Sequence, residues 1–362
     1  MTHLLDGSTA SFGRGATRAA VAGIIAGAAA ILAGLATGNG RLVFGVLDAN
    51  WLFFSGLAAG ALALSAAIRA AQGRWASALT PVAEAGSSFF APSLVLLAVL
   101  VLGARIWIAW TRDAAIGSVV FLAVRDLSLV ALLYGAGRRY LAAVRAGAVL
   151  TAPAIVYLLI YAAVMSVVAF DLVMSLYEGA ASTIVPALYF TGALLAGLAG
   201  STLAADVRGR LDTATRHDAA VLLFSLATFW AYLVWAAFLP TWYGNIPEET
   251  ALLLARWDGG YKPVTVFTLL ATALVPFALL IVGAGKRNPA IVRLAAASVF
   301  AGLFAESLLF VLPDLDLTAS AISLVLGSGV TAGVAGIFLL SLGNGLSRAG
   351  RSVPAAEHAA DV

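Results

Sequence analysis

The chain has 362 residues, of which 62% are hydrophobic and 11% are charged. Soluble domains carry about 25% charged residues, so this composition excludes a soluble protein and indicates an all-α protein that crosses the membrane many times. A formal net charge of +3 gives no indication of a nucleic-acid partner, and the absence of cysteine excludes disulfides and iron–sulfur ligation by this chain. Its three histidines lie in the tails or in a polar loop, so we expect no haem inside the bilayer, no metal ion and no covalently bound cofactor.

Ten apolar runs of about twenty residues predict ten transmembrane helices. The first eighteen residues are polar and rich in Gly and Ser. We interpret them as a cytoplasmic tail; the alternative is a cleaved signal peptide, because Arg18 precedes an Ala-rich run. The transmembrane domain is then residues 19–342, and residues 343–362 form a second tail. The predicted spans are Ala19–Thr37, Asn50–Ala70, Phe89–Trp110, Ala115–Gly135, Leu150–Leu176, Thr183–Ala205, Ala219–Pro240, Pro263–Gly283, Ala290–Leu312 and Ala319–Leu342.

The distribution of basic residues predicts the orientation of these spans. Of the 21 Lys and Arg residues, fifteen lie in tails and loops on the side of the N-terminus, and four lie on the opposite side. The remaining two, Arg105 and Arg125, lie inside predicted helices. Cytoplasmic loops carry the excess of Lys and Arg, so both termini are predicted to be cytoplasmic, in agreement with an even number of spans.

The longest loop on the outer side, residues 241–262, has a distinctive sequence. Turn signals stand at its beginning and end, and Pro247 followed by two glutamates is typical of the first turn of a helix. We therefore predict a short amphipathic helix over Glu248–Trp257. This loop is either an anchor at the membrane interface or a docking surface for an outer partner protein. The residues of that candidate docking surface are Trp242, Tyr243, Asn245, Glu248, Glu249 and Trp257.

Charged residues inside the predicted spans need an explanation, because a charge at the centre of a bilayer costs a few kcal/mol. Arg125 and Asp126 lie near the middle of the predicted fourth helix. Neighbours in a helix point about 100° apart, so we expect each to find a partner on another helix. Arg105, Asp171 and Glu306 are predicted to lie in the outer half of the membrane.

These charges allow three interpretations. The first is a structural network that determines how the helices pack. The second is a proton path from Glu84, at the inner end of the third span, through Asp126 to Asp171 or Glu306, with Arg105 and Arg125 adjusting the proton affinity of the acids. The third is contact of one of these groups with a quinone headgroup. If a proton path exists, Asp171 is the first candidate.

Tyrosines on the predicted fifth and sixth helices have two similar interpretations. Tyr157 and Tyr161 share one face of the fifth helix, and Tyr189 lies in the sixth. They either bridge a proton path or hydrogen-bond a quinone, or they form hydrogen bonds that hold packed helices together.

Several stretches of the sequence resemble one family of respiratory membrane subunits. They are FDLVMSL at Phe170–Leu176, Ser182–Ile184, FWAY at Phe229–Tyr232, WYGNIPEET at Trp242–Thr250 and KRNP at Lys286–Pro289. Together they resemble the ActF subunits of bacterial alternative complex III, a quinol:electron-acceptor oxidoreductase, within the NrfD/PsrC-like superfamily. The resemblance extends from about Glu84 to Leu312.

This resemblance implies ten spans arranged as two four-helix bundles with the first and last helices at the periphery, in a bacterial cytoplasmic membrane. It also implies a haem-free subunit that supports quinol oxidation, possesses no catalysis of its own, and is a candidate for proton conduction. The implied partners are an NrfD-like quinol-oxidising membrane subunit, a periplasmic iron–sulfur protein, multihaem and monohaem cytochrome c subunits, and membrane lipid. Quinone or quinol is the cofactor of the complex.

Two other functions remain open on the residues alone. Ten spans with buried charges are also typical of a secondary transporter, although Pro92, Pro186 and Pro276 do not form the matched pair of broken helices expected of one. The other alternative is a purely structural anchor for a membrane complex.

Overall fold

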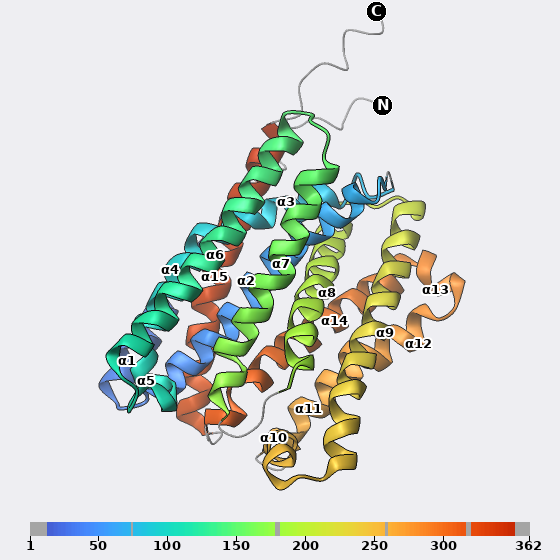
Figure 1. The fold of residues 1–362 in the computed structure, drawn as a ribbon. Coiled ribbons are helices and arrows are strands. Elements are labelled where there is room, and N and C mark those ends of the chain that lie inside the picture. Colours follow the sequence, from blue (N-terminus) through green and yellow to red (C-terminus); the bar gives the residue numbers. More distant parts are fainter. Residues whose placement is uncertain (1–12, 74, 178–181, 258–259, 316–319, 352–362) are drawn as a thin grey trace, which may run out of the picture.

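The computed structural model describes residues 13–73, 75–177, 182–257, 260–315 and 320–351. This part of the chain is helical with no strand, and ten of its segments are long and apolar enough to cross a membrane. Figure 1 shows these segments as one layered assembly of rods. The prediction of an all-α protein with about ten spans is confirmed.

The helices follow one another with short connections. The α-helices are α1 (Arg14–Ala36), α2 (Gly40–Ala70), α3 (Thr80–Ala85), α4 (Phe90–Leu102), α5 (Ala104–Trp107), α6 (Ile116–Arg145), α7 (Thr151–Leu172), α8 (Ile184–Val207), α9 (Thr213–Gly244), α10 (Pro247–Trp257), α11 (Lys262–Leu269), α12 (Val275–Leu280), α13 (Gly283–Arg287), α14 (Pro289–Val311) and α15 (Ala321–Arg351). The 3₁₀ turns are η2 (Gly86–Phe89), η3 (Ala109–Thr111), η4 (Met174–Leu176) and η6 (Pro313–Leu315), and η5 (Leu270–Leu274) is a π-helical turn.

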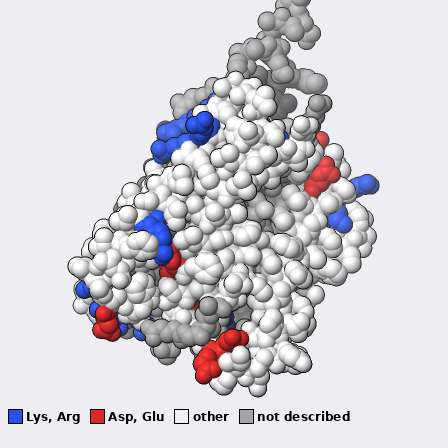
Figure 2. Space-filling model, viewed as in Figure 1, with Lys and Arg blue, Asp and Glu red and all other residues white. Residues whose placement is uncertain are grey.

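The ten spans form two four-helix bundles. The first contains α2, α3–α4, α6 and α7, and the second contains α8, α9, α11–α12 and α14. The bundles meet where α2 packs against α8, while α1 and α15 pack on each other beside α2. We call the side where α1 begins and α15 ends the inner side, and the opposite side the outer side. Figure 2 shows basic side chains gathered toward the inner end of the visible face.

Helix α2 is the centre of the molecule. It contacts α4, α7, α8, α14 and α15, so 94% of its most apolar stretch is buried, against 22% for α1, α6 and α9. A helix surrounded by other helices contacts protein on every face, whereas a peripheral helix contacts lipid. Polar side chains on α2 are therefore shielded from both water and lipid.

Glycines allow the closest helix pairs to approach. At the crossing of α2 and α8, a Cβ added to Gly60 would overlap the Ala193 carbonyl, and one added to Gly197 would overlap the Ala61 amide. In the pair α1–α15, a Cβ added to Gly27 would lie 2.6 Å from the Cα of Gly333. Helices in membranes associate through small residues that bring their backbones together, so these positions determine which helices pack.

Several predicted boundaries are wrong. Helix α2 begins at Gly40 rather than Asn50, and α6 continues to Arg145 rather than ending at Gly135. The third span begins at Thr80, and its long helix ends at Leu102 rather than Trp110. Polar residues at helix ends lower the local hydropathy without breaking the helix, because packing against neighbours outweighs local composition.

The first helix, the last helix and the helix before the outer loop are also longer than predicted. Helix α1 includes Arg14, and α15 runs nine residues beyond the predicted end at 342. Helix α9 extends to Gly244 and ends where Asn245 adopts a left-handed conformation with φ +47°. The short helix predicted after it is confirmed as α10.

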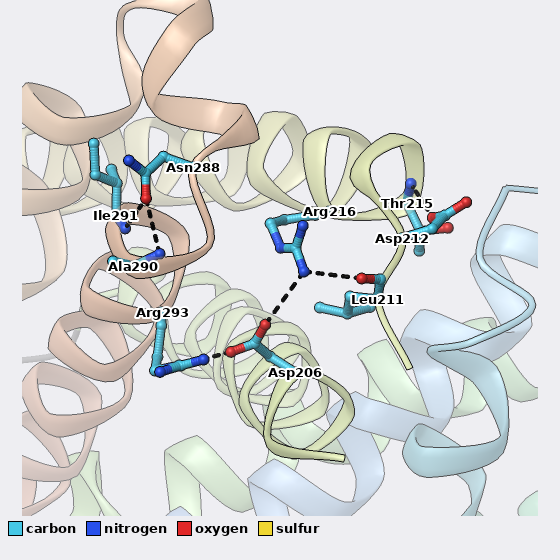
Figure 3. Close-up of polar contacts among 9 residues, drawn as sticks. All are labelled: Asp206, Leu211, Asp212, Thr215, Arg216, Asn288, Ala290, Ile291 and Arg293. Carbon is cyan, nitrogen blue, oxygen red and sulfur yellow. Dashed lines mark hydrogen bonds and ion pairs between the residues drawn. The ribbon is translucent and has the colours of Figure 1, made fainter. Parts of the chain in front are cut away.

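Ion pairs on the inner side join three helices of the second bundle (Figure 3). Asp206 at the end of α8 lies 2.7 Å from Arg293 Nε on α14 and 3.6 Å from Arg216 on α9. Asn288 caps the beginning of α14, where its side-chain oxygen accepts hydrogen bonds from two backbone amides. The inner ends of α8, α9 and α14 are thus held together by polar contacts.

The beginning of α9 is predicted to fray as the pH falls below about 4. The Asp212 carboxylate accepts a hydrogen bond from the Thr215 amide at 2.8 Å, and this bond lowers the pKa of Asp212 from its usual value. A carboxyl whose pKa is lower in the folded protein stabilises the fold above its unfolded pKa, and this contribution is lost as the pH falls through the folded value. Hydrogen exchange of the first amides of α9 measures this. In Asp212→Asn, which keeps the cap without a titrating group, exchange should not change over the same pH range.

Candidate functional site

A cluster of charged side chains lies in the outer half of the first bundle. One guanidinium nitrogen of Arg125 on α6 is 2.5 Å from a carboxyl oxygen of Asp171 on α7. Arg125 Nε lies 3.8 Å from a carboxyl oxygen of Asp126, and the guanidinium lies over the ring of Phe121, 5.0 Å from its centroid. The prediction that Arg125 has a partner on another helix is therefore confirmed.

Asp126 is fully buried in this cluster. Its side chain is 0% exposed, and neither of its carboxyl oxygens has a hydrogen-bond donor among the described residues. Asp126 and Asp171 both approach the guanidinium of Arg125, so the two carboxyl groups share one cation. Two carboxylates that share one guanidinium leave one negative charge unbalanced if both are ionised.

A third acid, Asp48 on α2, belongs to the same region and is absent from the sequence prediction. It is fully buried, its oxygens have no donor among the described residues, and its carboxyl interacts electrostatically with that of Asp126. The predicted span begins at Asn50 and therefore leaves Asp48 outside it. A helical signal was present, since Asp48, Trp51 and Ser55 recur with a spacing of three and four residues, as on one helix face. We call Asp48, Arg125, Asp126 and Asp171 the outer cluster.

The outer cluster lies nearer to the outer end of α6 than to its inner end. Arg125 lies nine residues from the beginning of a 30-residue helix, about 14 Å from its outer end. This distance is close to half of a hydrocarbon core of about 30 Å, so the mid-membrane position of Arg125 and Asp126 stays a prediction. The side chain of Arg125 is 35% exposed on the side of the bundle.

Farther inward, three hydroxyl groups form a buried chain between α2, α4 and α6. Ser55 and Ser93 lie 2.6 Å apart, and Ser93 lies 2.6 Å from the hydroxyl of Tyr134. Trp51 Nε1 donates to the Ser93 carbonyl at 2.9 Å and holds α4 against α2. Hydroxyl groups both donate and accept hydrogen bonds. The hydrogen bonds along this row of three hydroxyl groups can therefore point in either direction.

Glu84 lies near the inner side, separate from the outer cluster. Its carboxylate accepts a hydrogen bond from Ser65 at 2.7 Å and pairs with Arg69, also at 2.7 Å. Ser65 in turn lies 3.0 Å from the Tyr140 hydroxyl. Seventeen residues of α2 separate Asp48 from Ser65, about 25 Å. Glu84 and Asp126, the first two acids of the predicted path, are therefore too far apart for direct proton transfer.

The polar groups of the first bundle nevertheless lie in one column. Helices α2 and α6 both run from the outer to the inner side, and each carries a polar side chain at three matching depths. The matching residues are Asp48, Ser55 and Ser65 on α2 and Asp126, Tyr134 and Tyr140 on α6. Intervals of about 10 and 15 Å along α2 separate the three levels, so the column is interrupted by apolar layers.

Glu306 lies in the second bundle. Its carboxylate accepts a hydrogen bond from Trp230 Nε1 at 3.0 Å, and it borders a cavity of about 20 Å³ beside Tyr189 and Ser307. A cavity of this size holds one water molecule. The structure thus places Glu306 on α14 with α8 and α9, and brings it together with neither Asp126 nor Asp171.

Arg105 is not part of a buried site. The long helix of the third span ends at Leu102, so Arg105 lies in the short helix α5 at the outer surface. Its guanidinium is exposed and donates to the Ala114 carbonyl at 3.2 Å. The prediction that Arg105 acts on buried acids is wrong, because Gly103 ends the helix before the chain reaches that position.

The three tyrosines considered from the sequence all hydrogen-bond to backbone carbonyls. Tyr157 donates to Ala59 at 3.0 Å, Tyr161 to Phe190 at 2.6 Å and Tyr189 to Leu52 at 3.0 Å. Each bond joins two different helices. This geometry favours the packing interpretation over a proton path or a quinone contact for these three residues.

The candidate docking surface is exposed on the outer side. Tyr243 is 85% exposed and Trp242 62% exposed, while Asn245, Glu248, Glu249 and Trp257 are also exposed. Figure 2 shows an acidic group over α10. Helix α10 is held in place by Tyr177, which donates to the Glu248 carbonyl, and by Arg256.

Replacement of Arg256 by methionine is expected to release α10 from the bundle. The Arg256 guanidinium donates two hydrogen bonds to Asp314, at 2.8 and 3.2 Å, and Asp314 is 1% exposed. Loss of such a charge-assisted pair costs about 2 kcal/mol. The rate of hydrogen exchange over Pro247–Trp257 should therefore rise. The control is Arg112→Met, which removes an exposed arginine bound to a backbone carbonyl. It should leave the exchange rate of α10 unchanged.

Among the described residues, no group of three or more His, Cys, Asp and Glu side chains is placed to hold a metal ion. Comparison of the chain with family models and with curated proteins finds no match.

Proposed function

We propose that this chain is a haem-free membrane subunit of a quinol:electron-acceptor oxidoreductase of the alternative complex III type, and that its outer cluster exchanges protons. The observation that carries the proposal is the position of Asp171. It lies in FDLVMSL, one of the stretches that resemble the ActF family, and it pairs with Arg125, which Asp126 also approaches. The resemblance and the geometry thus point independently to the same carboxyl group.

The charges of the outer cluster support proton exchange. Three carboxyl groups and one guanidinium would carry a net charge of −2 if all were ionised. Unpaired charge inside a bilayer is costly, so the cluster reaches electrical balance only by holding protons. A proton shared between nearby carboxyls can be taken up or released when a neighbouring charge changes. The hydroxyl chain Ser55–Ser93–Tyr134 and the Glu84 network lie farther inward along α2 and α6, separated from the outer cluster and from each other by apolar layers.

The proposed partners follow from the same family resemblance. They are an NrfD-like quinol-oxidising membrane subunit, a periplasmic iron–sulfur protein and cytochrome c subunits, with quinone or quinol as the cofactor of the complex. The exposed aromatic and acidic residues around α10 are the surface that an outer partner would contact. Oxidation of quinol is assigned to the partner subunit, and this chain supplies a route for protons in a bacterial cytoplasmic membrane.

The test is purification of the tagged chain from its native membrane, followed by proton and electron measurements. We expect cytochrome c and iron–sulfur subunits to accompany the chain. Asp171→Asn and Asp126→Asn should leave the complex assembled but slow proton uptake linked to quinol oxidation by at least about tenfold. Glu306→Gln is the matched control, a buried acid outside the outer cluster. Normal proton uptake and quinol oxidation in both aspartate variants would exclude the proton-exchange role.

A secondary transporter is the second candidate, and one observation favours it. The third and eighth spans each contain a turn that is not α-helical, η2 and η5, and interrupted helices at corresponding positions are typical of transporters. In η5, the Ser298 hydroxyl donates a hydrogen bond to the Ala271 carbonyl at 2.7 Å. This carbonyl oxygen therefore already has a hydrogen-bond donor. Recovery of a lone chain that moves a solute across vesicle membranes would establish this function instead.

A further inference from the structure

An apolar cavity opens between α2, α8, α14 and α15 in the inner half of the membrane. Its volume is about 330 Å³, within the range of ligand-binding pockets. Along α8 it extends from Gly200 to Arg208, about 12 Å. The hydrocarbon core of a bilayer is about 30 Å thick, so the cavity has nearly the depth of one leaflet.

The lining of this cavity suits a hydrocarbon chain. Aliphatic and aromatic side chains such as Leu57, Phe300 and Phe338 form nearly all of it, and the polar residues in the lining are Ser201 and Arg208. Its edge faces the lipid, because Leu339 is 42% exposed and Val207, which also lines the cavity, is 78% exposed. A molecule can therefore enter from the surrounding membrane.

The inner end of the cavity has unbalanced positive charge. Arg208 is half-buried and forms no ion pair in the part of the chain that the structure describes. Asp206, two residues earlier in the chain, is already paired with Arg216 and Arg293 (Figure 3). Partial burial and the nearby charge of Arg210 lower the pKa of Arg208 from its usual value. An anion between the two guanidinium groups would remove this repulsion.

We propose that this cavity binds an anionic phospholipid of the inner leaflet, with one acyl chain between α8 and α15 and the lipid phosphate at Arg208 and Arg210. Arginine recognises phosphate through paired, charge-assisted hydrogen bonds, and basic pockets between helices on the cytoplasmic side are typical sites for anionic headgroups. The lipid would join the two bundles to the peripheral helix α15. This site is independent of the proposed electron-transport function.

The test is lipid binding to the delipidated full chain in detergent, measured by native mass spectrometry during titration with phosphatidylglycerol. Arg208→Gln/Arg210→Gln should weaken binding by about tenfold, which corresponds to about 1.4 kcal/mol. Ala204→Phe places a ring in the cavity and should weaken binding by a similar factor. Phosphatidylcholine should bind the wild-type chain at least about tenfold more weakly than phosphatidylglycerol, because it carries no net negative charge.

Matched controls separate the cavity from general surface effects. Arg138→Gln/Arg139→Gln removes two exposed inner arginines, and Ala142→Phe enlarges an exposed residue of α6; both should bind phosphatidylglycerol as the wild type does. Equal weakening in the arginine control would overturn the proposal in favour of surface electrostatics. Three other results would also overturn the proposal. They are unchanged lipid binding in Ala204→Phe, competition by glycerol phosphate without acyl chains, and displacement of the lipid by a quinone.

Discussion

Replacement of Arg125 by leucine is expected to destabilise the protein by about 3 kcal/mol or more, because it removes the positive charge of the outer cluster. Asp171 would lose an ion pair of 2.5 Å, and Asp126 would remain fully buried with no cation near it. Removing one partner of a buried ion pair costs about 3–5 kcal/mol, since the other charge is left uncompensated. Loss of folded protein with denaturant or heat, followed by tryptophan fluorescence in detergent micelles, measures the change.

The double variant Arg125→Leu/Asp171→Leu provides the decisive comparison. It removes both charges of the pair, so it should recover a large part of the stability lost in the single variant. Arg105→Leu is the matched control, since that arginine is exposed and bound to a backbone carbonyl, and its loss should cost less than about 0.5 kcal/mol. Equal destabilisation of the single and double variants would show that Arg125 and Asp171 are not energetically coupled.

Gly197→Ala is expected to have the second large effect, a destabilisation of about 3 kcal/mol at the crossing of α2 and α8. The added methyl group would overlap backbone atoms of Gly60 and Ala61. Overpacking usually costs about 1–3 kcal/mol when side chains can move, and here the obstructing atoms are backbone on a central helix. The two bundles must therefore separate to accommodate it, and we expect a lower melting temperature and a smaller yield of folded protein.

Gly135→Ala on α6 is the control for helix propensity. A Cβ at Gly135 meets no atom within 4 Å, and alanine is a better helix former than glycine by about 1 kcal/mol. The control should therefore be at least as stable as the wild type. If Gly197→Ala were equally stable, the close approach of α2 and α8 would not be what holds the bundles together.

The local sequence determined the class of protein, the number of spans and the short outer helix. Each depends on properties that a single segment carries by itself: about twenty apolar residues cross a bilayer, and Pro247 with two glutamates begins a helix wherever it lies. The expectation that Arg125 needs a partner on another helix also follows from local geometry, because adjacent residues in a helix point in different directions. These predictions needed no knowledge of which helices meet.

Only the tertiary structure decided how the charged residues are grouped. It brought Asp48 of α2 beside Asp126 of α6, paired Arg125 with Asp171, and left Glu306 in the other bundle with Trp230. It also placed Arg105 outside the group of buried charged residues, because the long helix of the third span ends before Arg105. Helix contacts in lipid depend on the shape of small-residue surfaces such as those at Gly60 and Gly197, which are far apart in the sequence. Hydropathy measures how apolar a segment is and contains no information about which neighbour it meets.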